Sequence, residues 1–89
     1  MRSRTTDRFR KGLLRLPAHI RDQAREAFRV WTKTPYHPAL RFKRVHPVRP
    51  FYAARVGLRY RAVALVDGED ATWFWIGTHE EYNKLLTNL

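Results

Sequence analysis

The sequence has 89 residues and a net charge of +10, with 44% apolar residues, 13% aromatic residues and no cysteine. This composition excludes an intrinsically disordered chain, and the lack of cysteine excludes disulfides, thiolate nucleophiles and cysteine metal sites. No apolar run is long enough to cross a bilayer or to follow the basic start as in a secretory signal, so we expect a cytoplasmic protein without membrane contact. A chain of this length has room for one modest core, and residues 1–89 are expected to form a single domain.

Two helices are predicted in the N-terminal third. Thr5 or Thr6 can cap a first helix, which ends before Pro17 because the residue before a proline avoids the helical region. A second helix follows, since apolar residues recur along one helical face over residues 20–31. It is expected to end near Thr34, ahead of a loop that contains two prolines.

After this loop the apolar residues recur with a period of two, which predicts strands. In residues 40–43, Leu40 and Phe42 alternate with basic residues, the pattern of a half-buried strand with a cationic outer face. Turn signals at residues 57–58 and 67–68 then separate three further strands of a meander.

The last predicted strand holds two tryptophans. Strict alternation would place Trp73 and Trp75 on one face of the sheet. Phe74 and Ile76 would then lie on the other face, so at least one pair belongs to the core, and the second either belongs to the core as well or forms a platform for stacked bases. A short helix is expected to follow over residues 79–86.

This order of elements predicts an α+β fold: two N-terminal helices packed on one face of a small antiparallel sheet of three to four strands, with a short C-terminal helix. The other face is expected to be open and basic. No acidic residue occurs in the 40 positions between Glu26 and Asp67. Charge of one sign destabilises a compact state, so it indicates an anionic partner such as nucleic acid, an acidic protein or, less often, a membrane surface. A solvated basic face is the alternative.

Four stretches, "FRKGLLRLPAHIRDQAREAF", "PYHPALRFKRV", "FYAARVGLRYRAVAL" and "WFWIGTHEEYNKLL", follow one another along nearly the whole chain. Their order and spacing resemble the RelE/ParE superfamily of toxins from bacterial type II toxin-antitoxin systems. The resemblance implies a small sheet with helices packed on one side and an active groove on the other. One departure is the N-terminus, where the family usually has a strand and "MRSRTT" leaves room only for a short one.

The resemblance implies two different activities. RelE-like members cleave messenger RNA, commonly on the ribosome and without metal, whereas ParE-like members inhibit DNA gyrase. Metal-free cleavage needs a base for the attacking 2′-hydroxyl, an acid for the leaving 5′-oxygen and cations for the dianionic phosphorane. The residues that match the family's catalytic positions are Arg55, Arg61, His79 and Tyr82. The further basic candidates for RNA binding are Arg41, Lys43, Arg44, Arg49 and Arg59.

Each assignment has a structural alternative. His79 can cap the terminal helix, and Tyr82 can pack its ring against the sheet. Arg61 can hold the terminal carboxylate, or Glu80 and Glu81, instead of RNA. For the protein as a whole, the alternatives are a ParE-like inhibitor of DNA gyrase without chemistry of its own and an inactive RelE-like binding module.

Partners follow from the resemblance and from the charge. The resemblance implies a cognate antitoxin, and an acidic, partly disordered segment that folds on contact suits a basic face. We expect this segment to lie as a helix or an added strand across the face that carries Arg41, Lys43 and Arg55. Messenger RNA, free or on the ribosome, is the expected substrate. No cofactor or metal is expected, because the other histidines lack the spacing of metal ligands.

Overall fold

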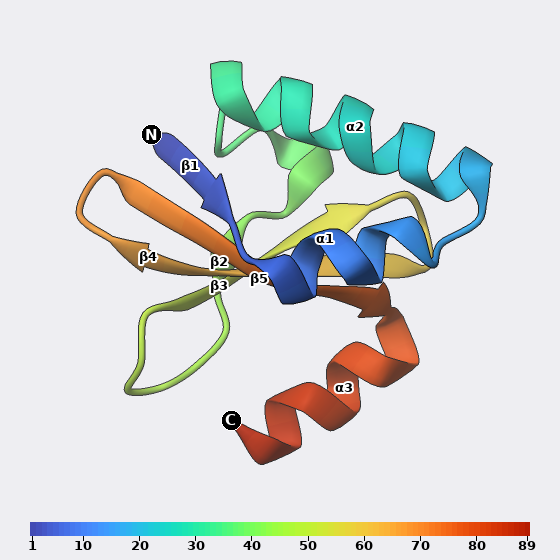
Figure 1. The fold of residues 1–89 in the computed structure, drawn as a ribbon. Coiled ribbons are helices and arrows are strands. Elements are labelled where there is room, and N and C mark those ends of the chain that lie inside the picture. Colours follow the sequence, from blue (N-terminus) through green and yellow to red (C-terminus); the bar gives the residue numbers. More distant parts are fainter.

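The computed structural model describes residues 1–89 as one five-stranded sheet with helices on both faces (Figure 1). The elements, in chain order, are β1 (Arg2–Thr5), α1 (Asp7–Leu14), α2 (Ala18–Lys33), a short 3-10 helix (Pro38–Leu40), β2 (Lys43–Arg44), β3 (Phe51–Val56), β4 (Tyr60–Asp67), β5 (Asp70–Thr78) and α3 (His79–Asn88). The strands lie in the order β1-β5-β4-β3-β2. This arrangement confirms the predicted α+β class with two N-terminal helices and a C-terminal helix. None of the helices combines the length and the apolar character that a membrane span requires.

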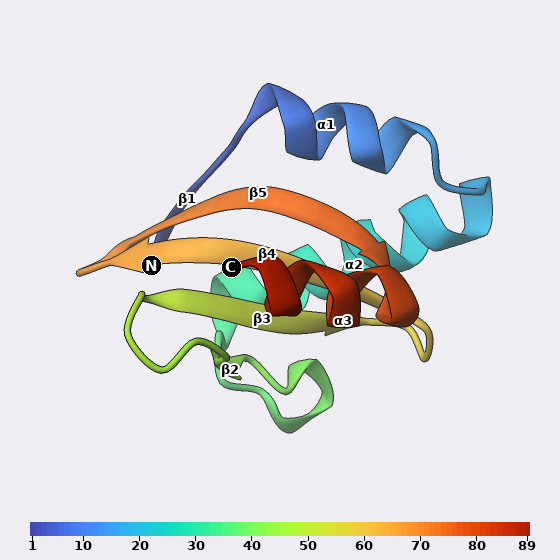
Figure 2. The same ribbon diagram turned by 90° about the horizontal axis from the view of Figure 1, so that it is seen from below.

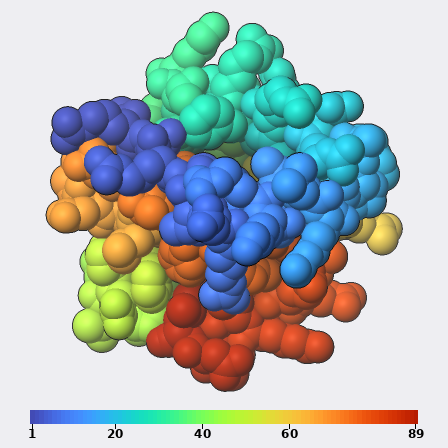
Figure 3. Space-filling model, viewed as in Figure 1, coloured from blue at the N-terminus to red at the C-terminus, as the bar shows by residue number.

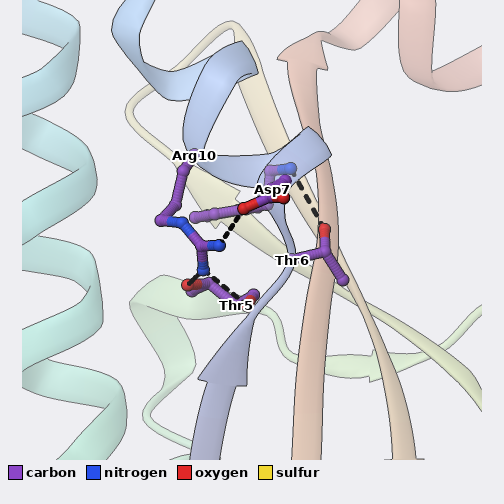
Figure 4. A network of polar contacts seen from close by, with 5 residues as sticks. Thr5, Thr6, Asp7 and Arg10 are labelled. Atoms are coloured by element: carbon purple, nitrogen blue, oxygen red, sulfur yellow. Dashed lines mark hydrogen bonds and ion pairs between the residues drawn. The ribbon is translucent and has the colours of Figure 1, made fainter.

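The chain turns from β1 into α1 through a network of polar contacts (Figure 4). The Thr6 hydroxyl accepts a hydrogen bond from the Phe9 N–H at 3.1 Å, so Thr6, one of the two predicted candidates, caps α1. Arg10 donates to the carbonyl oxygen of Thr5 at 2.7 Å and forms an ion pair with Asp7. These contacts link the end of β1 to the first turn of α1. They therefore fix the direction in which α1 leaves the sheet.

β1 adds a strand that the period-two pattern did not predict. It pairs in parallel with β5, from Arg2 opposite Asp70 to Thr5 opposite Trp73. The sheet is therefore mixed and has five strands, where three to four antiparallel strands were expected. The four residues of β1 carry no apolar alternation, and the ion pair between Arg2 and Asp70, at 2.8 Å, lies at the exposed edge. Only the resemblance indicated a short strand at this end.

The strand predicted over residues 40–43 is mostly not a strand. Leu40 ends the 3-10 helix, Arg41 has a left-handed backbone with a φ of 48°, and only Lys43–Arg44 pair with β3. Leu40 and Phe42 are nevertheless buried, as the alternation predicted. Both side chains reach the core from a bent segment. Alternating burial is compatible with a bent segment as well as with a strand, so the pattern alone could not decide between them.

The larger core lies between the sheet and the helices α1 and α2. At its centre the Trp31 ring makes edge contacts with Phe42 and Trp73, at centroid distances of 5.8 and 5.3 Å. We call this group the helix-side core, and its buried members are Trp31, Leu40, Phe42, Ala54, Val56, Ala62, Ala64, Val66, Ala71, Trp73 and Ile76. Between α1 and α2 an apolar groove of about 350 Å³ reaches down to Trp31 and Trp73. The prediction that the two N-terminal helices share one face is thus confirmed.

α3 lies over the face of the sheet opposite α2 (Figure 2), and a smaller apolar cluster packs there. We call it the α3-side cluster, and its buried members are Phe51, Ala53, Val63 and Tyr82. Leu85 and Leu86 of α3 also pack against it. The face that was expected to be open is therefore partly covered, because the apolar side of α3 needs a surface on which to be buried.

A β-bulge in β5 overturns the prediction for the tryptophans. Ala64 lies opposite Trp73 and Val63 lies opposite Trp75, so Phe74 is an extra residue in the ladder. Trp73 belongs to the helix-side core, whereas Phe74 and Trp75 both pack against the α3-side cluster. Strict alternation fails here because the bulge shifts the pleat of the strand by one residue.

Candidate active site

Two arginines lie directly opposite each other on the face that carries α3. Arg55 in β3 and Arg61 in β4 are partners in the antiparallel ladder, close to the hairpin turn. Arg55 Nε donates to the carbonyl oxygen of Gly57 at 3.0 Å, and Arg61 Nη1 donates to that of Tyr60 at 2.8 Å. A guanidinium has five N–H donors, so most donors of these two residues have no acceptor in the protein. We call Arg55 and Arg61 the arginine pair.

No carboxylate compensates the arginine pair. The ion pairs of the protein lie elsewhere and are Arg2–Asp70, Arg10–Asp7, Arg25–Asp22 and Arg29–Glu26. The pKa of Arg61 lies below its ordinary value, first because burial disfavours the charged form and then because Arg55 and Arg41 lie nearby. Like charges directly opposite each other destabilise a sheet. An anion bound between the two guanidiniums would remove this repulsion. The alternative that Arg61 holds Glu80 or Glu81 is not observed.

α3 places His79 and Tyr82 beside this pair. The Thr78 hydroxyl accepts from the Glu81 N–H at 3.1 Å, and the Glu81 carboxylate accepts from the Thr78 N–H at 2.8 Å, which forms a capping box. Thr78, and not His79, is therefore the helix cap. The His79 N–H donates to the carbonyl oxygen of Arg59 at 2.7 Å and ties the start of α3 to the β3–β4 turn. The rings of His79 and Tyr82 stack at a centroid distance of 6.0 Å.

Tyr82 combines packing with a polar group near Arg61. Its side chain is 8% exposed, and its ring lies 6.5 Å from that of Trp75, so the packing role considered from the sequence is present. Burial raises the pKa of Tyr82, and the positive charge of Arg61 opposes that rise. The phenol is therefore protonated at neutral pH and can donate a hydrogen bond. His79 is exposed and accessible to a ligand.

Three of the five candidates for RNA binding lie near the arginine pair. Lys43 is opposite Ala53, so its side chain leaves the sheet on the same face as Arg55. Arg41 lies close enough to Arg61 to lower its pKa. Arg59 is exposed in the turn that holds the start of α3.

Arg44 and Arg49 lie at the other end of β3. The Arg44 guanidinium donates to three carbonyl oxygens of the following loop, at 3.1, 2.6 and 3.2 Å, those of His46, Val48 and Arg49. The Arg49 guanidinium lies over the Phe51 ring, 5.3 Å from its centroid. The structure therefore does not bring these two cations to the arginine pair, and Arg44 holds its own loop together.

Trp75 and Gly77 also belong to this face, although the sequence did not single out Gly77. Gly77 lies opposite Arg61 in the ladder. A Cβ at Gly77 would lie 2.7 Å from the Trp75 ring and 2.9 Å from the Glu81 carboxylate, so glycine lets both side chains approach the strand. The available signal was a glycine inside an apolar strand, which marks a close approach. Nowhere in residues 1–89 do three His, Asp or Glu side chains gather in a way that could hold a metal ion.

The fold and the α3 face of the sheet together define a class of protein. Its members are small, basic α+β proteins in which a C-terminal helix places titratable side chains beside cations of the sheet. Residues 18–84 match the ParE-like toxin domain. The match spans most of the chain, which therefore belongs to the ParE-like toxin domain family. The membership of the RelE/ParE superfamily that the sequence motifs indicated is thus confirmed.

Solved toxin structures have the same fold. A chain of the RelB-RelE antitoxin-toxin complex from Methanococcus jannaschii has a TM-score of 0.73 and 20% identity, with 91% of this chain and 95% of that chain covered. The YoeB/ParE toxin from Agrobacterium tumefaciens has a TM-score of 0.70 and 15% identity, with coverages of 89% and 99%. A chain of the toxin-antitoxin complex RelBE2 from Mycobacterium tuberculosis has a TM-score of 0.68 and 25% identity, with coverages of 88% and 96%. No curated protein sequence matches the chain.

Proposed function

We propose that residues 1–89 form a toxin domain that cleaves messenger RNA, free or on the ribosome, without a metal ion, and so inhibits translation. One observation carries this proposal: the arginine pair faces no carboxylate and lies beside the stacked rings of His79 and Tyr82. Cations for a phosphorane and groups for proton transfer are thereby placed on one face, which is what metal-free cleavage requires.

The proposed reaction divides among these residues. The 2′-hydroxyl attacks the adjacent phosphorus, the bond to the 5′-oxygen breaks, and a 2′,3′-cyclic phosphate is left. Arg55 and Arg61 donate hydrogen bonds to the dianionic phosphorane, for which the planar fork of a guanidinium is suited. His79 takes the proton of the 2′-hydroxyl and returns it to the leaving 5′-oxygen, since an imidazole ring can both take and give a proton. Tyr82, protonated because burial raises its pKa, donates its hydrogen bond to a phosphate oxygen.

Arg41, Lys43 and Arg59 hold the phosphates that flank the cleaved bond. These contacts position the strand without reading its sequence. Arg44 and Arg49 lie at the far end of β3 and can meet only a longer strand, so their contribution to binding is expected to be smaller.

The test incubates the purified protein with a defined message, with and without ribosomes, beside a gyrase supercoiling assay. We expect cleavage of the message, loss of cleavage in His79→Ala, and normal supercoiling. Arg25→Ala is the matched control, because Arg25 is exposed and ion-paired with Asp22 on α2. An intact message together with full toxicity of His79→Ala would contradict the ribonuclease proposal.

The family match favours a second candidate function, since the domain is named ParE-like. In that case the basic face binds DNA gyrase and performs no chemistry. His79→Ala would then keep its toxicity, and supercoiling would be inhibited in the assay above. A protein that neither cleaves RNA nor inhibits gyrase would be an inactive binding module.

We also propose an antitoxin partner, because two of the structural relatives are toxin–antitoxin complexes. An acidic, partly disordered segment would lie across the face of Arg41, Lys43 and Arg55 and block it. Co-expression with the neighbouring reading frame tests this, and we expect an inactive complex that resists moderate salt. A partner that binds only around Arg21 and Arg25, and leaves the protein active, would contradict direct covering of the site.

A further inference from the structure

A second groove lies between α1 and the start of α3. Its volume is about 460 Å³, and β5 forms its floor from Trp75 to Gly77. Atoms of β5 are visible between those of α1 and α3 in the space-filling view (Figure 3). Gly77 lies opposite Arg61 in the ladder, so the backbone of this floor residue is one strand spacing, about 5 Å, from that of Arg61.

One wall of the groove is cationic. Arg8, Lys11 and Arg15 line it from the side of α1, at positions three and four residues apart that share one helical face. None of the three takes part in an ion pair. The acidic residue in the first turn, Asp7, is paired with Arg10 and therefore does not neutralise them.

The floor and the opposite wall offer different chemistry. The Trp75 ring rests over Gly77, whose lack of a Cβ leaves room for it. Glu81 Oε1 accepts the Thr78 N–H of the capping box, while Oε2 makes no hydrogen bond within the protein. The same capping bonds lower the pKa of Glu81, so its carboxylate is ionised at neutral pH. An aromatic surface, one acceptor and a row of cations match the base and the phosphates of a nucleotide.

We propose that this groove is a nucleotide subsite that holds the RNA strand on one side of the cleaved bond. Arg8, Lys11 and Arg15 bind phosphates, Trp75 stacks on a base, and Glu81 accepts a hydrogen bond from an amino group of that base. The inference rests on the proposed ribonuclease function and extends it: α1 takes part in substrate binding as well as in the core.

The first test separates the subsite from the arginine pair. A non-cleavable 2′-O-methyl RNA decamer spans both, whereas a cleavable trinucleotide fills only the arginine pair. In Lys11→Gln/Arg15→Gln we expect weaker binding of the decamer, a salt slope of log K lower by about 1.4, and unchanged cleavage of the trinucleotide. Arg4→Gln/Lys33→Gln is the matched control, because both cations are exposed and lie outside the groove.

The outcomes distinguish the two proposals. If the wild type cleaves RNA but Lys11→Gln/Arg15→Gln binds the decamer like the control, the subsite is wrong and the ribonuclease function stands. If the wild type neither binds the decamer nor cleaves RNA, both proposals are overturned. If an acidic peptide binds at Lys11 and Arg15 while the decamer does not, the groove binds protein instead of RNA, which also overturns the subsite.

Trp75 supplies a second readout. Stacking on a base quenches indole emission, and the buried Trp31 and Trp73 give a constant background. We expect the decamer to quench the wild type but not Trp75→Phe, whose affinity should fall by less than the roughly 5- to 100-fold of one whole base–aromatic stack, because phenylalanine still stacks. Emission that stays constant at saturation in the wild type would overturn the stacking role.

Glu81→Gln tests the reading of the base. Glutamine also completes a capping box, so the helix keeps its start while the carboxylate acceptor becomes an amide donor. We expect the wild type to favour adenine, cytosine and guanine homopolymers over uracil, and Glu81→Gln to lower this preference at least about 5-fold. An unchanged ranking of the homopolymers would overturn the role of Glu81.

Discussion

The cations of α2 and those of the α3 face of the sheet differ in whether they have acidic partners. On the face covered by α1 and α2, Arg25 and Arg29 pair with acidic residues three positions earlier on the same helix, and the surface beneath the helices is apolar. On the face of α3, Arg55 and Arg61 lie opposite each other without a carboxylate. The comparison teaches that net charge alone does not point to a candidate site, whereas cations left without acidic partners on a preorganised surface do.

The largest effect is expected from the helix-covered face. Trp31→Ala should lower the free energy of unfolding by about 3–5 kcal/mol, because Trp31 is 1% exposed and its removal leaves a cavity. Urea denaturation measures this value. Phe28→Ala is the comparison, since Phe28 stacks on Trp31 but is 44% exposed, and it should cost clearly less. Equal costs would mean that stability does not reside in the helix-side core.

On the α3 face, substitution should affect activity more than stability. Arg61→Ala should lower the rate of RNA cleavage roughly 100- to 1,000-fold, the usual effect of removing one donor to a developing oxyanion. The melting temperature should stay the same or rise, because a repulsion with Arg55 is removed. Arg61→Lys keeps the charge but lacks the fork of donors, so it should resemble Arg61→Ala. Wild-type activity in Arg61→Lys would mean that this position needs only a positive charge and not the fork of donors.

A smaller effect concerns affinity. Reversing Arg41 and Lys43 to Glu should weaken binding of all RNA sequences about equally and lower the salt slope of log K by about 0.7 for each phosphate that is no longer neutralised. Titration at several salt concentrations measures the slope. Reversing Arg25 and Lys33, which are exposed on α2 over the opposite face of the sheet, is the control. A slope that does not change between wild type and Arg41→Glu/Lys43→Glu would indicate that the face does not bind phosphates.

The smallest effect is a pH dependence at the start of α3. Hydrogen bonds from Thr78 hold the pKa of Glu81 below its ordinary value in the folded protein. A carboxyl group with a lowered folded pKa stabilises the fold above its unfolded pKa, and this contribution is lost as the pH falls through the folded pKa. We expect urea unfolding to show this loss in acid in the wild type, and a flatter curve in Glu81→Gln. An identical slope in both proteins would contradict the role of the capping box.

Local signals predicted most of the fold. Thr6 caps α1, α2 follows Pro17, and Gly57 and Gly68 take positive φ values in the turns of the meander. β1 escaped prediction because its four residues are held by a partner strand at the far end of the sequence and not by a pattern of their own. The bulge at Phe74 escaped for a similar reason, since an extra residue in a ladder is defined only by the strand beside it.

For the candidate site, the sequence predicted which residues take part better than it predicted how they are arranged. The motifs indicated the arginine pair, His79 and Tyr82, and the structure places them together. It also places Arg44 away from them, because Arg44 lies opposite Tyr52 and its guanidinium is bound by carbonyl oxygens of the following loop. The spacing of Arg8, Lys11 and Arg15 was visible in the sequence, but the groove they line exists only once α1 lies beside β5 and α3.

The pairing of β1 with β5 also sets the order in which the protein becomes complete during synthesis. Arg2 and its partner Asp70 are 68 residues apart. At about 5–20 residues per second, roughly 3 to 14 s pass on the ribosome between the two strands. Throughout that interval the edge of the sheet is missing, and His79 and Tyr82 have not yet been made. The arginine pair is complete only at Arg61, 18 residues before His79, so it precedes the residues proposed for proton transfer by only roughly 1 to 4 s of synthesis.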